Sequence, residues 1–301
     1  MNITLKQSIL FLATSFLFCH YGCEEVINNT NLPYEEKLVI RGIVLDGDSI
    51  DSLYVGRTLP YEEFRFGYWN SKDSIYVEND LSSFVKDAVV TISVDDQTYP
   101  LHYFKSGYYK NDSLVGATGK TYRLHIEWKG KIADAVTTIP ETPIVDSVNV
   151  AYKTTAVYTH GSEVEYSCSA YIHGKVNNIF SFELSHKHID SNPFDTSYHY
   201  TYEYSTGSAV KKRTQTDYNV PDIFTRKIVE YVNVGYIDPQ LIFTIKSYDE
   251  PYYKYFLSYK NLNSKDDFSI EPNPIDWNVS GNAIGMFIGA SKSVTKTYKL
   301  Q

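Results

Sequence analysis

Short segments rich in β-branched and aromatic residues recur along the chain, and polar turn residues separate them. Several segments alternate apolar with polar residues, which is the pattern of a half-buried strand. In the first half this pattern predicts strands at 37–45, 52–59, 88–94, 99–104, 121–128 and 132–139. Turn residues at 46–51 and 95–96 fit hairpins between them. Short strands at regular spacing predict a β-sandwich over residues 37–140.

A pair of prolines marks the best place for a domain boundary. The string Pro140-Glu141-Thr142-Pro143 favours a stiff, extended connection. Strand signals resume after it, at 147–152, 164–172, 179–188, 197–204 and 240–247. We therefore expect a second β-rich domain over residues 141–301.

Two segments of the second domain predict helices. Residues 221–232 begin with Pro221 and carry apolar side chains at helical spacing, namely Ile223, Phe224, Ile228, Val229 and Val232. Residues 249–262 have acids and a proline in the first turn and Lys260 near the end, which suits the helix dipole. The expected fold is thus mainly β, with two β-sandwich domains of immunoglobulin-like or transthyretin-like type. The second domain carries one or two short helices.

The first residues have the pattern of a secretory signal peptide. Lys6 gives a positive start, and an apolar run follows from Ile9 to Phe18. The run is shorter than the roughly 20 apolar residues that a transmembrane helix needs. We therefore expect residues 1–22 to be removed.

Gly22-Cys23, a small residue followed by cysteine, resembles a bacterial lipobox, in which the cysteine is lipidated and becomes the mature N-terminus. His20 stands where lipoboxes usually carry leucine, and the competing Cys19 fits worse because Phe18 precedes it. Ordinary cleavage, with Cys23 as a free thiol, is the alternative interpretation.

Residues 24–36 are polar and without periodicity, which predicts a tether. Glu24 and Glu25 resemble the signal that sends lipoproteins of Bacteroidota to the outer face of the outer membrane. We therefore expect a lipid-anchored protein of the bacterial outer membrane, exposed at the cell surface. The alternative is that the two glutamates only keep the tether soluble.

Composition narrows the choice of partners. The net charge is −8 and no basic stripe is present, which argues against a nucleic-acid partner. Cys168 is the one cysteine that follows Cys23, so no internal disulfide is expected. Its strand-like neighbours predict a small, buried apolar residue. We expect no cofactor.

Two groups of residues resemble metal ligands only in part. His186 and His188 have no third ligand at metal spacing, so we expect them to be solvated. Three aspartates lie close together in a calcium-loop-like string, namely Asp46, Asp48 and Asp51. Arg57 stands where such a loop needs a bidentate glutamate, so a hairpin turn is the preferred interpretation and no metal site is expected.

Tyrosine is unusually common, with 28 residues against 15 Phe and 3 Trp. Four tyrosines alternate in one expected strand, namely Tyr198, Tyr200, Tyr202 and Tyr204. Four more aromatics lie in the long connection 60–83, namely Phe64, Phe66, Tyr68 and Trp69. Both groups are candidate contact surfaces for a glycan, a peptide or a partner protein. Alternatively, the tyrosines pack on the sheet, and the loop aromatics cover the sandwich core or add a hairpin.

Asp-Ser followed by an aliphatic residue occurs five times, with the serines Ser49, Ser52, Ser74, Ser113 and Ser147. The tripeptide resembles the O-glycosylation sequence of exported Bacteroidota proteins, so these serines are candidate modification sites. The alternative is that Asp-Ser makes turns from which strands start.

Motifs for catalysis are missing. The chain has no G-x-S-x-G string, and Gly119-Lys120-Thr121 lacks the upstream glycine of a phosphate loop. We therefore expect no catalytic residues. A hydrolase that uses an unrecognised pair of carboxylates stays open as a further alternative.

Strings in a fixed order along the chain resemble one protein family. They are KLVIRGIVLDGD (37–48), KDAVVTISV (86–94), GKTYRLHIEWKGKIADAVTTIPETPIVDSV (119–148), SYDEPYYKYF (247–256) and EPNPIDWNVSGNAIGMFIGAS (271–291). The chain resembles a family of Bacteroidota outer-membrane lipoproteins known as domain of unknown function 4249. That family has a Glu-Pro pair and an Asn-Ile-x-Gly-Gly-x-Gly type of segment with an aromatic. The matching positions are Glu271-Pro272, Asn278-Val279, Gly281, Gly285 and Phe287, and Asn282 replaces the second glycine.

The resemblance implies a function, because members of that family are often encoded beside TonB-dependent transporters of the outer membrane. We expect a surface-exposed, lipid-anchored accessory or binding protein of such a transport system, without catalysis. The alternative is an independent glycan-binding or adhesive module of the cell surface.

Overall fold

The structure is a computed structural model. It describes residues 34–60, 68–70, 75–77, 83–159, 161–175, 177–191, 199–205, 209–217, 219–233, 236–263 and 274–299. The chain divides into two compact units, Met1–Glu35 and Glu36–Gln301. The fold described below is that of the second unit, and the expected signal peptide, Cys23 and most of the tether lie outside the described residues.

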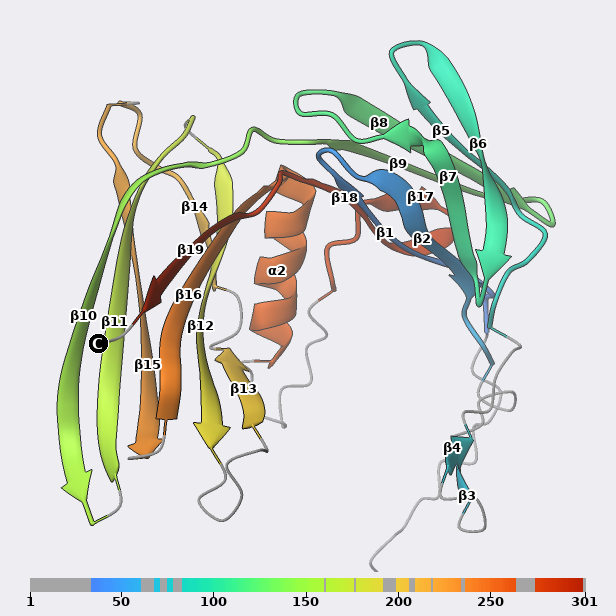
Figure 1. The fold of residues 1–301 in the computed structure, drawn as a ribbon. Coiled ribbons are helices and arrows are strands. Elements are labelled where there is room, and N and C mark those ends of the chain that lie inside the picture. Colours follow the sequence, from blue (N-terminus) through green and yellow to red (C-terminus); the bar gives the residue numbers. More distant parts are fainter. Residues whose placement is uncertain are drawn as a thin grey trace, which may run out of the picture. The chain divides into compact units, whose positions relative to one another are not determined.

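Strands make up most of the described chain (Figure 1). The first nine are β1 (Leu38–Leu45), β2 (Ser49–Arg57), β3 (Tyr68–Asn70), β4 (Ile75–Val77), β5 (Val89–Val94), β6 (Gln97–Lys105), β7 (Tyr108–Val115), β8 (Thr121–Trp128) and β9 (Lys131–Thr138). The next seven are β10 (Ile144–Tyr158), β11 (Gly161–His173), β12 (Ile179–Ser191), β13 (His199–Ser205), β14 (Ala209–Lys212), β15 (Asp222–Asn233) and β16 (Tyr236–Tyr248). The helix α2 (Glu250–Asn263) precedes β17 (Val279–Gly281), β18 (Ala283–Ala290) and β19 (Val294–Lys299).

One long, curled sheet runs through the molecule (Figure 1). It has 14 strands, with the main order β13-β12-β16-β18-β1-β2-β7-β6-β5-β8-β9-β17, while β14 joins β12 and β19 joins β16. A second sheet has the order β10-β11-β15. The expected mainly β, sandwich-like fold is therefore confirmed, and α2 is the only helix in the described residues.

Two hydrophobic cores are present. The first is built by inward-facing side chains of β1, β2, β5 to β9, β17 and β18, such as Ile40, Leu53 and Phe287. The second lies between the three-stranded sheet and strands β12 and β16, with Cys168, Phe182 and Phe243 among its members. The first core thus contains residues from both ends of the described chain. The proposed domain boundary near Pro140 stays a prediction.

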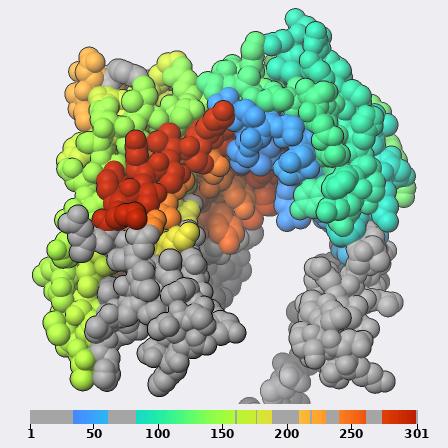
Figure 2. All heavy atoms as spheres, viewed as in Figure 1, coloured from blue at the N-terminus to red at the C-terminus, as the bar shows by residue number. Residues whose placement is uncertain are grey.

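A parallel strand pair joins the carboxy-terminal part of the described chain to its amino-terminal part. β18 lies beside β1 in register from Leu38 opposite Ala283 to Leu45 opposite Ala290. Figure 2 shows the red carboxy-terminal residues lying against the blue amino-terminal ones. Because β1 also pairs with β2, it is a central strand with neighbours on both edges.

The helix expected at 221–232 is wrong, because this segment forms strand β15. It pairs with β11 along its length, from Ile172 opposite Asp222 to Gly161 opposite Asn233. Phe224 and Ile228 are buried and lie four residues apart, a spacing that one helical turn and two strand repeats share. The β-branched residues of the segment and the open edge of β11 favour the strand. The helix expected at 249–262 is confirmed as α2.

The long connection 60–83 contains a short hairpin, in which β3 pairs with β4 and Trp69 lies opposite Tyr76. Strands β7, β14, β17, β18 and β19 were not among the expected ones. The string of β7, YYKNDSLV, is largely polar, and Tyr109 and Leu114 are its only buried residues. A strand with so few buried positions gives a weak alternation signal.

Candidate functional site

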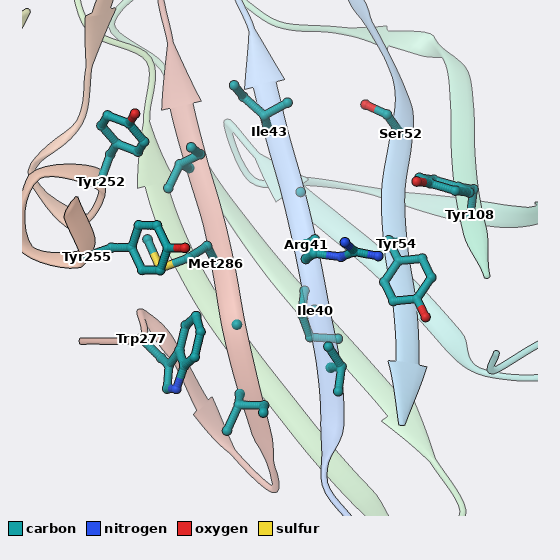
Figure 3. A pocket seen from close by; sticks show the side chains of 15 residues that line it. Ile40, Arg41, Ile43, Ser52, Tyr54, Tyr108, Tyr252, Tyr255, Trp277 and Met286 are labelled. Carbon is teal, nitrogen blue, oxygen red and sulfur yellow. The ribbon is translucent and has the colours of Figure 1, made fainter. Parts of the chain in front are cut away.

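An open, apolar groove of about 510 Å³ lies among the described residues (Figure 3). It lies over the outward face of β1 and β18, with α2 on one side and β2 with β7 on the other. Its lining consists of Val39, Ile40, Arg41, Gly42, Ile43, Ser52, Tyr54, Tyr108, Tyr252, Tyr255, Trp277, Ile284, Gly285, Met286 and Ile288. Cavities of this size and apolar lining are typical of sites for small molecules.

The floor follows from the alternation of the two parallel strands. Leu38, Ile40 and Phe287 point into the first core. Their neighbours in sequence point to the opposite face, so Arg41 and Met286 lie side by side on the groove floor. The aliphatic side chains of both strands continue this floor on either side of them. The groove is therefore built on a paired sheet rather than on loops.

The first wall belongs to helix α2. Asp249 caps this helix, because the backbone N–H of Tyr252 donates a hydrogen bond to its Oδ1 at 3.3 Å. Tyr252 and Tyr255 lie three residues apart and therefore share one helix face. Tyr252 stacks on Tyr248 at 4.0 Å between ring centroids, which fixes the start of the wall.

Trp277 extends this wall, and two hydrogen-bonded neighbours hold it there. The N–H of Asp276 donates to Ser258 Oγ on the helix at 3.0 Å. On the other side, the Asn278 amide donates to the Phe287 carbonyl at 2.6 Å and accepts from the Phe287 N–H at 2.8 Å. The indole stacks with Tyr255 at 5.6 Å and is still 39% exposed. An exposed, stacked aromatic pair is a good contact surface for a ligand.

The opposite wall centres on Tyr54. Its ring has the guanidinium of Arg41 at 4.3 Å from the centroid, a cation–π distance. Tyr108 meets the same ring edge-on at 5.6 Å. Gly56 and Gly107 make room for the ring, because a Cβ at either position would lie within 3 Å of a Tyr54 atom. Arg41 is thus held beside a ring that is itself packed in place.

Charge in the groove is limited to one residue. Arg41 is the only ionisable group with a full charge at neutral pH among the lining residues. The remaining polar side chains are the Ser52 hydroxyl, the tyrosine hydroxyls and the Trp277 indole N–H, and the lining contains no carboxylate or amide side chain. The groove is therefore apolar with a single positive charge, in a chain whose net charge is −8.

Asp249 links the groove wall to the 14-stranded sheet. Its Oδ2 accepts hydrogen bonds from the Thr137 hydroxyl on β9 and from the Gly289 N–H on β18. Burial raises the pKa of Asp249 from 3.8 to about 6, and the hydrogen bonds from Thr137, Gly289 and Tyr252 only partly oppose the rise. The low dielectric of the site thus favours the protonated carboxyl.

This raised pKa predicts a loss of stability as the pH rises. Because the folded pKa of Asp249 exceeds the unfolded one, its contribution is fully present below about pH 4 and is lost through about pH 6. A shift of this size corresponds to on the order of 3 kcal/mol. Urea unfolding from pH 4 to pH 7 measures this contribution. The quantity to follow is the unfolding free energy of the wild type minus that of the Asp249→Asn variant. We expect this difference to fall across the range. A constant difference would show that Asp249 ionises with an ordinary pKa.

The aromatics proposed from the sequence are not the residues that line the groove. The strand expected around Tyr200, Tyr202 and Tyr204 is confirmed as β13, and Tyr68 with Trp69 belongs to β3. Their side chains, and all of Phe64, Phe66 and Tyr198, lie outside what the structure describes. Their role in binding stays a prediction. Sequence reasoning missed the groove residues, although the spacing of Tyr252 and Tyr255 on an expected helix was a usable signal.

The candidate glycosylation serines occupy different settings. Ser49 and Ser52 lie in β2, Ser113 in β7 and Ser147 in β10, while Ser74 lies outside the described residues. The aliphatic residues that follow three of them are buried in the first core, namely Ile50, Leu53 and Leu114. Core packing thus accounts for part of the repeated tripeptide, and modification of the serines stays a prediction.

The other singled-out residues have structural roles. Asp46 and Asp48 lie at the β1–β2 hairpin, as expected, whereas Asp51 lies in β2, so the turn is shorter than the expected 46–51. The expectation of a solvated His186 is wrong, because it is fully buried and its ring stacks with Tyr166 at 5.5 Å. The side chain of His188 lies outside the described residues. Cys168 is buried as expected, and this burial raises the pKa of its thiol to about 11.

Within the described ranges, no group of three or more His, Cys, Asp or Glu side chains could hold a metal ion. In the same ranges, no helix is long and apolar enough to cross a membrane.

Comparisons with known proteins place the chain in a family. A search of curated proteins finds no match. The sequence model of one family, described as domain of unknown function (DUF4249), matches residues 25–296. This match covers nearly all of the chain, so the protein belongs to the DUF4249 family.

Proposed function

We propose that this protein is a lipid-anchored binding protein of the bacterial outer membrane, exposed at the cell surface, and that the groove between α2 and β2 takes up its ligand. The observation that carries the proposal is an open apolar groove with the Tyr255–Trp277 pair on one wall and Arg41 on its floor. Its floor is a paired sheet, the Trp277 wall is hydrogen-bonded to the helix and the Tyr54 wall is packed against Tyr108, which limits the cost of ordering on binding. The proposed role is binding without catalysis.

We further propose that it serves as an accessory of a TonB-dependent transporter. The support is the resemblance of the chain to lipoproteins encoded beside such transporters. Mild detergent extraction of a tagged chain from native membranes tests this part of the proposal. Recovery of a large outer-membrane protein with the chain supports it, and migration of the chain alone counts against it.

The anchor at Cys23 gives a separate prediction. In cells fed an alkyne-tagged fatty acid, we expect the wild-type protein to carry the tag and to sediment with the outer membrane. The Cys23→Ala variant should lose both properties, because acylation contributes about 0.8 kcal/mol for each buried CH₂ group. Cys19→Ala is the matched control and should behave as the wild type. A tagged Cys23→Ala protein would refute this assignment of the anchor.

A second function, an independent glycan-binding or adhesive module, has one observation in its favour. The exposed, stacked Tyr255–Trp277 pair would suit the apolar face of a sugar ring. A glycan array with the wild type and Trp277→Ala separates the functions. Retention of an oligosaccharide by the wild type alone would favour this second function.

A further inference from the structure

We infer that the ligand of the groove is a small amphipathic carboxylate. Its apolar body would lie against the Tyr255–Trp277 pair and the aliphatic floor, and its carboxylate would meet Arg41. This inference rests on the proposed binding function and narrows the ligand to a chemical class.

The first argument is the state of the arginine. Arg41 is exposed, its guanidinium lies over the Tyr54 ring, and it makes no ion pair or hydrogen bond with the described residues. A guanidinium has five N–H donors and no acceptor, and its planar fork matches a carboxylate. Two other arginines have carboxylate partners, Arg57 with Glu36 at 2.9 Å and Arg213 with Asp222 at 2.6 Å, whereas Arg123 on β8 has none among the described residues and lies outside the groove. Arg41 therefore offers donors that the fold itself does not use.

The second argument is the amount of charge. Arg41 supplies one positive charge, and no second cation lines the groove. A phosphate monoester carries close to two negative charges at neutral pH and would bring charge that the lining does not balance. A carboxylate carries one. The single arginine therefore favours a monoanion.

The third argument concerns the backbone of the floor. β1 is paired on both edges, with β18 and with β2. The outer edge of β18 is occupied at Phe287 by the Asn278 amide and at Gly289 by Asp249. At these positions, a polypeptide therefore finds no free strand edge on the floor with which it could pair as an additional strand. A peptide would bring a polar backbone group with each residue into an apolar groove, whereas an amphipathic small molecule brings one polar end.

The fourth argument concerns sugars. A sugar presents many hydroxyls, each of which needs hydrogen-bond partners when water is removed. The lining offers hydroxyls and two donor-only groups, Arg41 and the Trp277 indole, but no carboxylate or amide to accept from several hydroxyls at once. A molecule with an apolar body and one anionic end matches this lining better, because the body contacts the apolar side chains and the anionic end contacts Arg41.

One methionine methyl group can report binding directly. The chain has two methionines, Met1 and Met286, and Met286 lies on the groove floor beside Arg41. We would prepare the full chain with ¹³C-labelled methionine methyls in lipid nanodiscs and assign the Met286 signal with Met286→Leu. The probes are 4-phenylbutanoate, 4-phenylbutan-1-ol and 4-phenylbutylamine, which share a body and differ in the charge of the head group.

We expect a saturable shift of the Met286 signal, with 4-phenylbutanoate binding roughly five- to tenfold more tightly than the alcohol, and the amine weakest. Arg41→Gln should remove the preference for the carboxylate while binding of the alcohol stays within about twofold. Arg123→Gln, an exposed arginine of β8 outside the groove, is the matched control and should keep the preference. Trp277→Ala should weaken the binding of all three probes to the same extent.

Two results would overturn the inference, and they differ in what they say of the proposed function. If the three probes bind equally and Trp277→Ala weakens them, the groove binds ligands but does not select a carboxylate. If no probe gives a saturable shift, neither the carboxylate nor the groove as a ligand site stands. The anchor and the transporter association are decided independently by the labelling and extraction experiments above.

Discussion

Gly285→Ala is expected to lower the free energy of unfolding by about 3–5 kcal/mol, more than most single substitutions do. Gly285 lies in β18 opposite Ile40 of β1. Its φ is +131°, a backbone conformation that residues with a side chain rarely adopt. A Cβ there would lie 1.9 Å from the Ile40 carbonyl oxygen. Backbone of a central strand cannot move aside cheaply, so the parallel pair under the groove would have to separate locally.

Gly119→Ala is the control for this substitution. Gly119 has a φ of +78° and nothing within 4 Å of its ideal Cβ, so alanine there brings backbone strain without a clash. We expect a cost of about 1 kcal/mol for it. Urea unfolding followed by circular dichroism measures both variants. Equal losses would mean that β18 does not approach β1 as described.

The second large effect is expected at Arg213, which is fully buried. Its guanidinium donates to Asp222 Oδ2 at 2.6 Å and to the Val220 carbonyl at 2.8 Å. It also donates to the Asp217 carbonyl at 2.8 Å, so one side chain holds the connection that leads into β15. Arg213→Met should lower the unfolding free energy by about 3–5 kcal/mol, because it leaves the Asp222 carboxylate, whose side chain is only 13% exposed, and two backbone carbonyls without their partner.

Two further variants make this second prediction specific. Lys227→Met removes the exposed partner of Glu165 and should cost less than about 1 kcal/mol. The double variant Arg213→Met with Asp222→Leu should recover much of the loss, because it removes both charges of the pair. Chemical denaturation of the set gives the comparison. A loss at Arg213 no larger than that at Lys227 would contradict the structural role of this arginine.

The strands of the first half could be read from the sequence because their apolar residues alternate against one core. The strand expected at 121–128 has these bounds in the structure as β8, and its buried residues are Tyr122, Leu124, Ile126 and Trp128. Residues 221–232 were misread because Phe224 and Ile228 fit a helix and a strand equally well. The pairing of this segment with β11 decides between them.

The groove could not be predicted in the same way. Arg41, Tyr54, Tyr255 and Trp277 belong to distant segments, which the pairing of β1 with β18 brings together. That pairing joins the two ends of the described chain, and no short stretch of sequence indicates it. The string AIGMFIGA of β18 is nearly all apolar, so it does not show which residues face the groove and which face the core.

The asparagine and glycines of residues 278–287 have a structural reason. Asn278 pairs with the backbone of Phe287, and Gly281 and Gly285 have positive φ with no room for a Cβ. Asn282 does not have a positive φ, so a side chain is tolerated there. These residues thus shape the groove floor and position Trp277 rather than carrying chemistry themselves.

The central claim is that the groove over β1 and β18 is the ligand site, and photolabelling tests it most directly. The full chain in nanodiscs would be irradiated with a benzophenone carboxylate, digested and mapped by mass spectrometry, with and without excess 4-phenylbutanoate. We expect adducts on the peptides that carry Tyr252, Tyr255, Trp277 and Met286, and their loss under competition. Saturable adducts confined to other segments, or labelling that competitor does not reduce, would contradict this placement of the site.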